Sequence, residues 1–372
     1  MKIVHIITSL TEGGGQSLLY NFVNNKIPNK HIVICLLKNG MYIDLLRKKG
    51  IKVYALDFQN IKCILKSISN LRKIIKNENP EIIHSWLYHA NLITILPFLM
   101  RTDLKIIWSV HNSSISLKTI SLNTLIVAIF NSIISYFVPN KIICASKDAI
   151  DCHLKIKFNM RKMFLIPNGI DTEIYKPKKY NRNIKSDLGI KNKIVFAMIA
   201  RYDKAKDHNN LVEALRLLKR KNTDWNLLLI GEGMENNNPH LNKLLNKAGI
   251  QDLTFCLGIR RDIEYILNGI DFNILSSFSE DQPIVLMEAM SCEKLCIGTD
   301  VGSTKIIIDK FGWLVPKSNP YELYKSILEA QNKDQDFINR LSKGARKHIK
   351  ENFSIKNMIK NYNYLYSQVH HN

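Results

Sequence analysis

The sequence predicts an α/β protein built from two parallel-sheet domains. Its length of 372 residues exceeds what one hydrophobic core usually organises, so two domains of about 150–200 residues are the natural division. Short apolar runs alternate with amphipathic stretches along the chain, a pattern typical of parallel strands joined by crossover helices. A polar, basic stretch at residues 176–192 separates two such alternating sets and predicts an interdomain linker.

The first alternating set occupies residues 1–179. Its apolar runs predict strands near residues 2–7, 31–37, 51–56, 81–84, 104–110, 141–144 and 163–166. Between them, the spacing predicts helices near residues 16–25, 41–49, 60–77, 88–100, 119–137 and 146–154. In open parallel sheets, ligands bind beyond the carboxyl ends of the strands, so the residues that follow the strands are the candidates for a site.

Gly13, Gly14 and Gly15 follow the first predicted strand and precede a helix. Consecutive glycines let the main chain approach a diphosphate closely, and a helix start adds N–H donors. The run is not the G-x-G-x-x-G fingerprint, and a tight turn without a ligand is the alternative. His111 ends the fifth strand, where it either contacts a ligand or caps the next helix.

Residues 122–138 carry no charged side chain. On a helical projection, one side holds Thr124, Ala128, Asn131, Ser132 and Ser135, and the other holds Leu122, Leu125, Ile126, Ile129, Ile133 and Phe137. Two interpretations stay open: a buried crossover helix, or a helix that lies partly in a bilayer surface. Basic clusters at residues 47–49 and 62–76 support the hypothesis of docking on an anionic membrane.

The second alternating set extends over residues 190–352. It predicts strands near residues 193–200, 225–231, 253–257, 271–276, 294–298 and 312–315, and late helices near 321–331, 336–350 and 354–369. Arg201 and Lys206 follow the first of these strands and precede a helix expected at 209–220. A guanidinium and an ammonium that converge there suit a diphosphate, and ordinary solvated cations are the alternative. Gly231 and Gly233 end the next strand, where small residues leave room for a nucleotide base.

The stretch at residues 276–302 holds the remaining candidates. Glu280 lies in a polar loop after a strand, and Pro283 opens an amphipathic helix at a first-turn position where its missing N–H costs nothing. The free N–H groups of that helix start, at Ile284 and Val285, would face a phosphate. Glu280 and Glu288 can bind two parts of one ligand. The alternative is that both are solvated carboxylates on a surface helix and its preceding loop.

Six elements in this order resemble the group 1 (family 4) retaining glycosyltransferases, which have the two-domain GT-B fold. They are Gly13–Gly15, Ile166–Asp171, the loop from Arg201 to His208, Gly231–Gly233, the E-x7-E pair Glu280 and Glu288, and Asp300–Gly302. The resemblance covers nearly the whole chain. It implies two Rossmann-like domains that face each other across a cleft, an acceptor-binding domain at 1–179 and a nucleotide-sugar domain at 190–352. A last helix at 353–372 would cross back onto the first domain.

The resemblance implies transfer of a sugar, with retention, from a nucleotide-diphosphate donor, expected to be UDP-linked, to a glycan or polyprenyl-linked acceptor. Catalytic roles then fall on Glu280, His111, Arg201 and Lys206. Substrate-binding roles fall on Gly13, Gly14, Gly15, Asn168, Gly231, Gly233, Ile284, Val285 and Glu288, with Glu288 on the ribose. Fixed cations and helix dipoles would stabilise the departing diphosphate, so we expect neither a metal nor another cofactor.

Three positions depart from the family pattern. Asp281 stands where a glycine usually follows the first glutamate, Glu293 replaces a glycine in a helix-to-strand turn, and Lys305 stands where glutamate is common. Asp281 puts a negative charge beside the expected phosphates. It keeps open the alternative of a nucleotide-sugar-binding protein with weak or no transfer activity.

The formal net charge of +21 is unevenly distributed, because residues 1–180 hold 25 of the 53 Lys and Arg but only 10 of the 32 Asp and Glu. Such a basic half fits an anionic membrane surface, a nucleic acid, or the Lys- and Asn-rich usage of an AT-rich genome. We expect no nucleic-acid partner, since no RNA- or DNA-binding motif is present.

Seven cysteines without a C-x-x-C pair indicate free thiols, and the N-terminus resembles a strand rather than an export signal. We therefore expect a cytoplasmic protein, peripheral on the inner face of the cell membrane.

Overall fold

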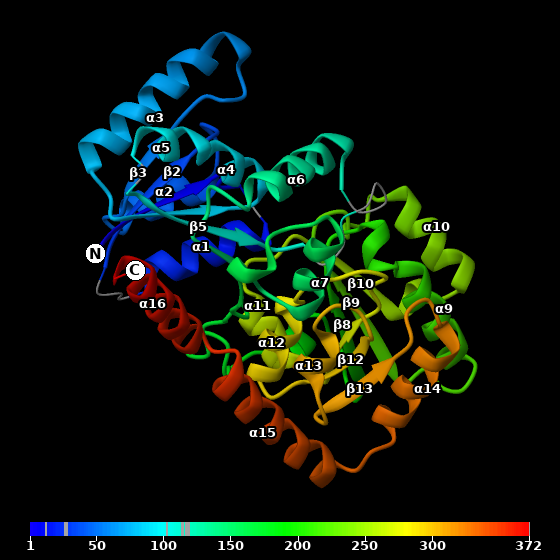
Figure 1. The fold of residues 1–372 in the computed structure, drawn as a ribbon. Coiled ribbons are helices and arrows are strands. Elements are labelled where there is room, and N and C mark those ends of the chain that lie inside the picture. The colour runs from blue at the N-terminus through cyan, green and yellow to red at the C-terminus, as the bar shows by residue number, and fades with distance from the viewer. Residues whose placement is uncertain (12, 26–28, 102, 113–114, 116–119, 372) are drawn as a thin grey trace. The chain divides into compact units, whose positions relative to one another are not determined.

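The computed structural model describes residues 1–371 apart from 12, 26–28, 102, 113–114 and 116–119. The chain divides into two compact units (Figure 1). The first comprises Met1–Gly169 together with Ile355–Asn372, and the second comprises Ile170–Ser354. The boundary expected at residue 179 therefore lies inside the second unit, and the last helix groups with the first unit.

The first unit contains a seven-stranded sheet in the order β3-β2-β1-β4-β5-β6-β7. Its strands are β1 (Lys2–Ile7), β2 (Lys30–Cys35), β3 (Lys52–Ala55), β4 (Ile82–Trp86), β5 (Lys105–Val110), β6 (Lys141–Cys144) and β7 (Met163–Leu165). Every neighbouring pair is parallel, as the alternating pattern predicts. The strand order reverses between β1 and β4, so the loop after β1 lies at the switch point where ligands bind in such sheets.

Helices cover both faces of this sheet (Figure 1). One face carries α1 (Gly14–Asn24), α2 (Met41–Lys48) and α16 (Ile355–His371). The other carries α3 (Ile64–Glu78), α4 (Tyr88–Ile93), α5 (Ile95–Met100), α6 (Leu122–Ile134) and α7 (Lys147–Lys155). The helix expected at 119–137 is shorter, and residue 119 itself lies outside the described residues.

The single helix predicted over residues 88–100 is instead two helices, α4 and α5. The break is at Thr94, whose hydroxyl donates to the Asn91 carbonyl at 2.6 Å. Pro97 has no N–H to donate to the carbonyl four residues earlier, so an unbroken helix would lose a hydrogen bond there.

The C-terminal helix α16 completes the core of the first unit. Tyr362 and Tyr366 are fully buried, and the Tyr362 ring centroid lies 5.0 Å from that of Phe22 in α1. Tyr366 Oη lies 2.7 Å from Nδ1 of His84 in β4. In Figure 1 this red helix lies beside the blue α1.

The second unit contains a six-stranded parallel sheet in the order β10-β9-β8-β11-β12-β13. Its strands are β8 (Ile194–Ile199), β9 (Trp225–Ile230), β10 (Thr254–Gly258), β11 (Phe272–Leu275), β12 (Leu295–Thr299) and β13 (Gly312–Val315). Its helices are α8 (Ile184–Asp187), α9 (His208–Lys219), α10 (Pro239–Ala248), α11 (Ile263–Gly269), α12 (Ile284–Ser291), α13 (Thr304–Ile308), α14 (Pro320–Gln331) and α15 (Gln335–Asn352). The order reverses between β8 and β11, so the loops after these two strands flank the switch point.

Candidate active site

Lys206 and Glu280 meet at the switch point of the second sheet. Lys206 ends a short 3₁₀ turn, η3 (Lys204–Lys206), after β8, and Glu280 lies in the loop after β11. Lys206 Nζ is 2.5 Å from Glu280 Oε1, and Ser277 Oγ donates to the same oxygen at 2.6 Å. The two charged side chains are only 22% and 11% exposed, so their attraction is screened less than that of a surface pair.

Hydrogen bonds to main-chain carbonyls of η3 hold these two loops together. Ser276 Oγ, at the end of β11, donates to the Lys206 carbonyl at 2.9 Å, and the Phe278 N–H donates to the Ala205 carbonyl at 2.7 Å. Asp207, which follows Lys206, has a left-handed backbone conformation with φ of 47° and is the N-cap residue of α9. The position of Lys206 is therefore fixed by backbone contacts as well as by its ion pair.

Gly302, in the loop after β12, packs against the loop that carries Glu280. Its φ is 53°, and a Cβ there would clash with the carbonyl oxygens of Glu280 and Asp281. The adjacent Ser303 N–H donates to the Asp281 carbonyl at 2.8 Å. The Asp-x-Gly element is thus explained by the close approach of two loops, which only glycine permits.

Glu288 is the one charged residue of α12. Its carboxyl is half-buried and hydrogen-bonds with the Tyr175 side chain. Burial raises the pKa of Glu288 to about 7, the Tyr175 bond opposes that rise, and the nearby Glu264 charge adds to it. Glu288 therefore changes charge close to neutral pH. Tyr175 lies just beyond the Ile166–Asp171 element and was not among the predicted site residues.

Two expectations about α12 are wrong in detail. Pro283 is the N-cap residue, with φ of −71° and ψ of 101°, and Ile284 rather than Pro283 is the first helical residue. The helix is not amphipathic, because residues on most of its sides are buried: Leu286, Met287, Ala289, Met290 and Ser291. Ile284 and Val285 still supply the first N–H groups of the helix, which lack intrahelical partners.

Gly231 and Gly233 join the loop after β9 to the Arg201 loop. Gly231 has φ of 138°, and a Cβ there would clash with the Ala200 carbonyl. Gly233 has φ of 77°, and its Cβ would lie 2.7 Å from Cβ of Tyr202. Loop packing therefore requires both glycines, and their predicted contact with a nucleotide base stays a prediction.

Arg201 is not part of the Lys206–Glu280 pair. Its side chain is 65% exposed, and its Nε lies 3.3 Å from Oδ2 of Asp203. Both cations follow β8 as predicted, and Lys206 contacts the first glutamate of the E-x7-E pair.

In the first unit, the three glycines form the start of α1. Gly13 is the N-cap residue, Gly14 is the first helical residue, and both are exposed. A Cβ on Gly14 would meet nothing within 4 Å, whereas one on Gly15 would lie 3.6 Å from the Leu87 side chain. The main chain at Gly14 is thus accessible to a ligand.

His111, directly after β5, stacks on Trp86 with ring centroids 5.8 Å apart and an interplanar angle of 4°. Within the described part of the chain, its buried Nε2 has no hydrogen-bond partner. Burial lowers the pKa of His111 to about 4, so the ring is neutral near pH 7. Ser121, not His111, caps the next helix, because its hydroxyl accepts from the Thr124 N–H. Asn168 is buried in the same unit, after β7.

A buried histidine network in the first unit was not predicted. His5 Nε2 lies 2.8 Å from His31 Nδ1, and Trp86 Nε1 donates to His5 Nδ1 at 3.1 Å. His84 lies within 2.7 Å of both Tyr366 Oη and Ser109 Oγ. Burial lowers the pKa of all three histidines. Among the residues described, no group of three or more His, Cys, Asp or Glu is placed to hold a metal ion.

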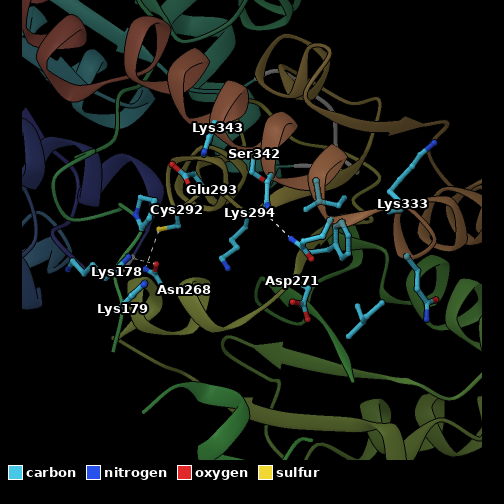
Figure 2. Close-up of a pocket in the computed structure, with 18 residues that line it drawn as sticks. Lys178, Lys179, Asn268, Asp271, Cys292, Glu293, Lys294, Lys333, Ser342 and Lys343 are labelled. Atoms are coloured by element: carbon cyan, nitrogen blue, oxygen red, sulfur yellow. Dashed lines mark hydrogen bonds between the residues drawn. The ribbon is translucent and has the colours of Figure 1, made fainter. Parts of the chain in front are cut away.

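A separate cavity of about 540 Å³ lies at the amino ends of β8, β11 and β12 (Figure 2). Its lysines are Lys178, Lys179, Lys294, Lys333 and Lys343. Helices α11, α12 and α14 end beside it, and the partial negative charge of helix C-termini favours cations there. The lysines thus have a structural explanation, and the cavity lies at the opposite strand ends from Lys206 and Glu280.

Two family models match the chain in succession. The model described as Glycosyltransferase Family 4 matches residues 13–174, and the model described as Glycosyl transferases group 1 matches residues 181–348. Among the helices that the structure describes, none combines the length and the apolar composition of a membrane-spanning segment.

Relatives and solved structures agree with these matches. The UDP-Gal:alpha-D-GlcNAc-diphosphoundecaprenol alpha-1,3-galactosyltransferase of Escherichia coli is 24% identical over 95% of this chain and 94% of its own. The N,N'-diacetylbacillosaminyl-diphospho-undecaprenol alpha-1,3-N-acetylgalactosaminyltransferase of Campylobacter jejuni is 25% identical over 73% of each chain. The crystal structure of Anabaena HepE in complex with UDP has a TM-score of 0.86 at 18% identity, covering 99% of this chain and 100% of that one. This likeness identifies the fold as GT-B.

Proposed function

Because the chain belongs to the group 1 and family 4 glycosyltransferases, we propose that it transfers a hexosyl or N-acetylhexosaminyl group from a UDP-linked donor, with retention at the anomeric carbon. Two relationships support the choice of UDP: the Anabaena protein of the same fold was crystallised with UDP, and the E. coli relative is named for UDP-Gal.

The Lys206–Glu280 pair carries the proposal. Its 2.5 Å contact at the switch point joins a cation to a carboxylate. An incoming diphosphate competes with Glu280 for the Lys206 ammonium. The carboxylate that is released can then accept hydrogen bonds from the hydroxyls of the donor sugar. In this proposal, the contact keeps the Lys206 ammonium and the Glu280 carboxylate beside the C–O bond that breaks between the sugar and the diphosphate.

Negative charge grows on the diphosphate as the sugar departs, and fixed positive groups lower the energy of that state. Lys206 and Arg201 supply full charges, and the N–H groups of Ile284 and Val285 supply the positive end of the α12 dipole. We assign this role to the protein alone, without a divalent cation. The main chain at Gly14, exposed in the first unit, is retained as a substrate-binding element on the family resemblance.

Glu288 is assigned to the ribose of the nucleotide. An ionised carboxylate can accept from two neighbouring hydroxyls, and Tyr175 already holds the Glu288 side chain in place. His111 is assigned to the donor sugar because its neutral ring keeps one nitrogen without a partner in the described structure. Asn168 is retained as a substrate-binding residue on the family resemblance.

We assign the acceptor to the polyprenyl-diphosphate-linked glycans, acted on at the inner face of the cell membrane during surface polysaccharide synthesis. The names of the E. coli and C. jejuni relatives both specify an undecaprenol diphosphate acceptor. The excess of Lys and Arg in the first half of the chain favours an anionic lipid surface.

Two substitutions test the assignment of the glutamates. We expect Glu280→Ala to lower turnover while UDP still binds, and Glu288→Ala to weaken UDP binding. Glu213→Ala, which removes a carboxylate on α9, is the control and should leave both unchanged. Normal transfer by both site variants would refute the site.

Donor and metal are tested together by thermal shift with UDP-, GDP- and ADP-sugars, with and without EDTA. We expect stabilisation by the UDP-sugars alone, unaffected by EDTA. UDP binding without measurable transfer to a polyprenyl-linked acceptor would favour a binding protein and point to Asp281 as the departure responsible.

A further inference from the structure

Helix α6 directs its apolar side chains outward. Its buried side consists of small and polar residues, namely Ala128, Asn131 and Ser132, followed by Ser135 just past its end. The large apolar residues on the opposite side are 44–72% exposed: Leu122, Ile126, Ile129, Phe130, Ile133 and Phe137. We name these six residues the α6 face. An ordinary surface helix is arranged the other way, with its apolar stripe against the core.

Hydrogen bonds on the buried side fix this orientation. Asn131 Nδ2 donates to the Tyr88 carbonyl of α4 at 2.8 Å, and Ser135 Oγ accepts from the Asn159 N–H at 3.0 Å. Rotating α6 to bury its apolar residues would break both bonds and leave buried polar groups unpaired. The exposed apolar surface is therefore a property of the fold, and it marks an interaction site.

Cations border the carboxyl-terminal end of α6. Lys162 Nζ donates to the Tyr136 carbonyl at 2.8 Å, which places the short turn η2 (Met160–Lys162) beside the end of the helix. Met160 adds an apolar side chain that is 68% exposed, and Arg161 is exposed next to it. Residues 121–165 hold six Lys and Arg against two acids, so the surroundings of the face are basic.

We propose that the α6 face docks into an anionic bilayer surface, with the helix parallel to the membrane plane and the basic residues at its end beside the lipid phosphates. At 13 residues, α6 is too short to span a bilayer but suits an interfacial helix. A lipid surface fits better than a second copy of this chain, because two such basic units repel each other whereas anionic lipids attract them.

This inference rests on the proposed membrane location. Its test needs neither donor nor acceptor, so its failure is distinguishable from failure of the sugar-transfer assignment. The full-length protein is sedimented with phosphatidylcholine vesicles that contain phosphatidylglycerol, and with phosphatidylcholine vesicles alone. We expect binding to the anionic vesicles.

Ile133→Ser is expected to weaken binding to the anionic vesicles on the order of tenfold, because one apolar side chain no longer enters the lipid. Ile306→Ser in the second unit is the matched control, since Ile306 is 52% exposed and Ile133 is 58% exposed. The control should bind like the wild type. Both variants should keep the thermal midpoint and UDP affinity, which shows that they fold.

Two further variants separate insertion from charge attraction. Phe130→Trp should be quenched by brominated lipids, as expected for a side chain within the acyl region. Arg161→Gln should reduce only the preference for anionic lipid. Equal vesicle binding by wild type and Ile133→Ser, or no quenching of Phe130→Trp, overturns the proposal. The proposal is also overturned if the wild type binds no vesicles but self-associates, and Ile133→Ser abolishes that self-association.

Discussion

The ammonium of Lys206 and the carboxylate of Glu280 share a 2.5 Å hydrogen bond between the loops that follow β8 and β11. If both groups serve one transition state, their effects on catalysis must be coupled. We expect Lys206→Met to lower kcat/KM for the donor by about 10²–10³-fold, as for loss of a group that stabilises developing charge. In a Glu280→Gln background the same change should cost much less. Equal losses in both backgrounds, measured by steady-state kinetics, would contradict a shared role.

Glu288 makes stability and UDP affinity depend on pH. Its pKa is raised to about 7 from the ordinary 4.5, so the folded chain binds more protons than the unfolded chain between these values. The stability that the neutral carboxyl confers is therefore complete below pH 4.5 and lost as pH rises through 7.

The free energy of unfolding of Glu288→Gln relative to that of the wild type should therefore increase between pH 5 and pH 8, by at most about 3 kcal/mol. UDP affinity should change in the opposite sense, because the ionised form accepts the ribose hydroxyls: the wild type should bind more tightly at pH 8 than at pH 6. Calorimetric titration across this range measures the affinity, and Glu288→Gln should show no such rise.

Gly302→Ala should destabilise the protein by about 3 kcal/mol, since it adds left-handed strain and a clash with the carbonyls of Glu280 and Asp281. Gly189→Ala is the matched control. Gly189 has φ of 68°, but a Cβ there meets nothing within 4 Å, so only the strain of about 1 kcal/mol should remain. Chemical denaturation gives both values, and equal losses would show that the loop contact is unimportant.

Glu293 is left-handed, with φ of 58°, at the turn where the family pattern has glycine. Glu293→Gly should therefore stabilise the protein by about 1 kcal/mol, because relief of strain exceeds the added entropy of the unfolded chain. Glu293→Ala, which keeps the Cβ, should bring no gain. A loss of stability in the glycine variant would mean that the Glu293 side chain makes a compensating interaction.

The buried histidines predict acid sensitivity of the first unit. The pKa of His31 is lowered to about 4, and those of His5 and His84 lie well below 6.5, so the unfolded chain binds more protons below pH 6.5. Stability should fall as pH decreases from 6.5 towards 4, and His31 alone should account for a loss of up to about 2 kcal/mol at pH 5. Hydrogen exchange at pH 5 should increase first in β1, β2 and β4. Unchanged protection there would contradict the prediction.

The strands and the loops that carry candidate residues could be predicted because parallel strands buried on both faces have continuous apolar runs. The orientation of α6 could not. Its projection separates two faces, but the hydrogen bonds from Asn131 to Tyr88 and from Asn159 to Ser135 determine that the polar face is buried. For α12, a single glutamate suggested an amphipathic helix, whereas neighbouring helices cover its other sides.

Other parts of the site depend on contacts between distant segments, which a local pattern does not contain. Gly231 was interpreted as room for a nucleotide base, and Gly302 was noted only as part of a family element. The structure adds that each faces the carbonyl of another loop. Tyr175 carries no motif of its own and becomes part of the site only because it meets Glu288. His5 and His31 are paired only through the register of β1 and β2.

The position of α16 has a consequence during synthesis. A ribosome makes residues 1–169 long before residues 355–371, yet Tyr362 and Tyr366 belong to the core of the unit made first. Until the last helix leaves the exit tunnel, the nascent first unit exposes His84 and Phe22 to chaperones and proteases. The second unit is one continuous segment and can fold while translation continues. The first unit is therefore completed only after the whole second unit has been made.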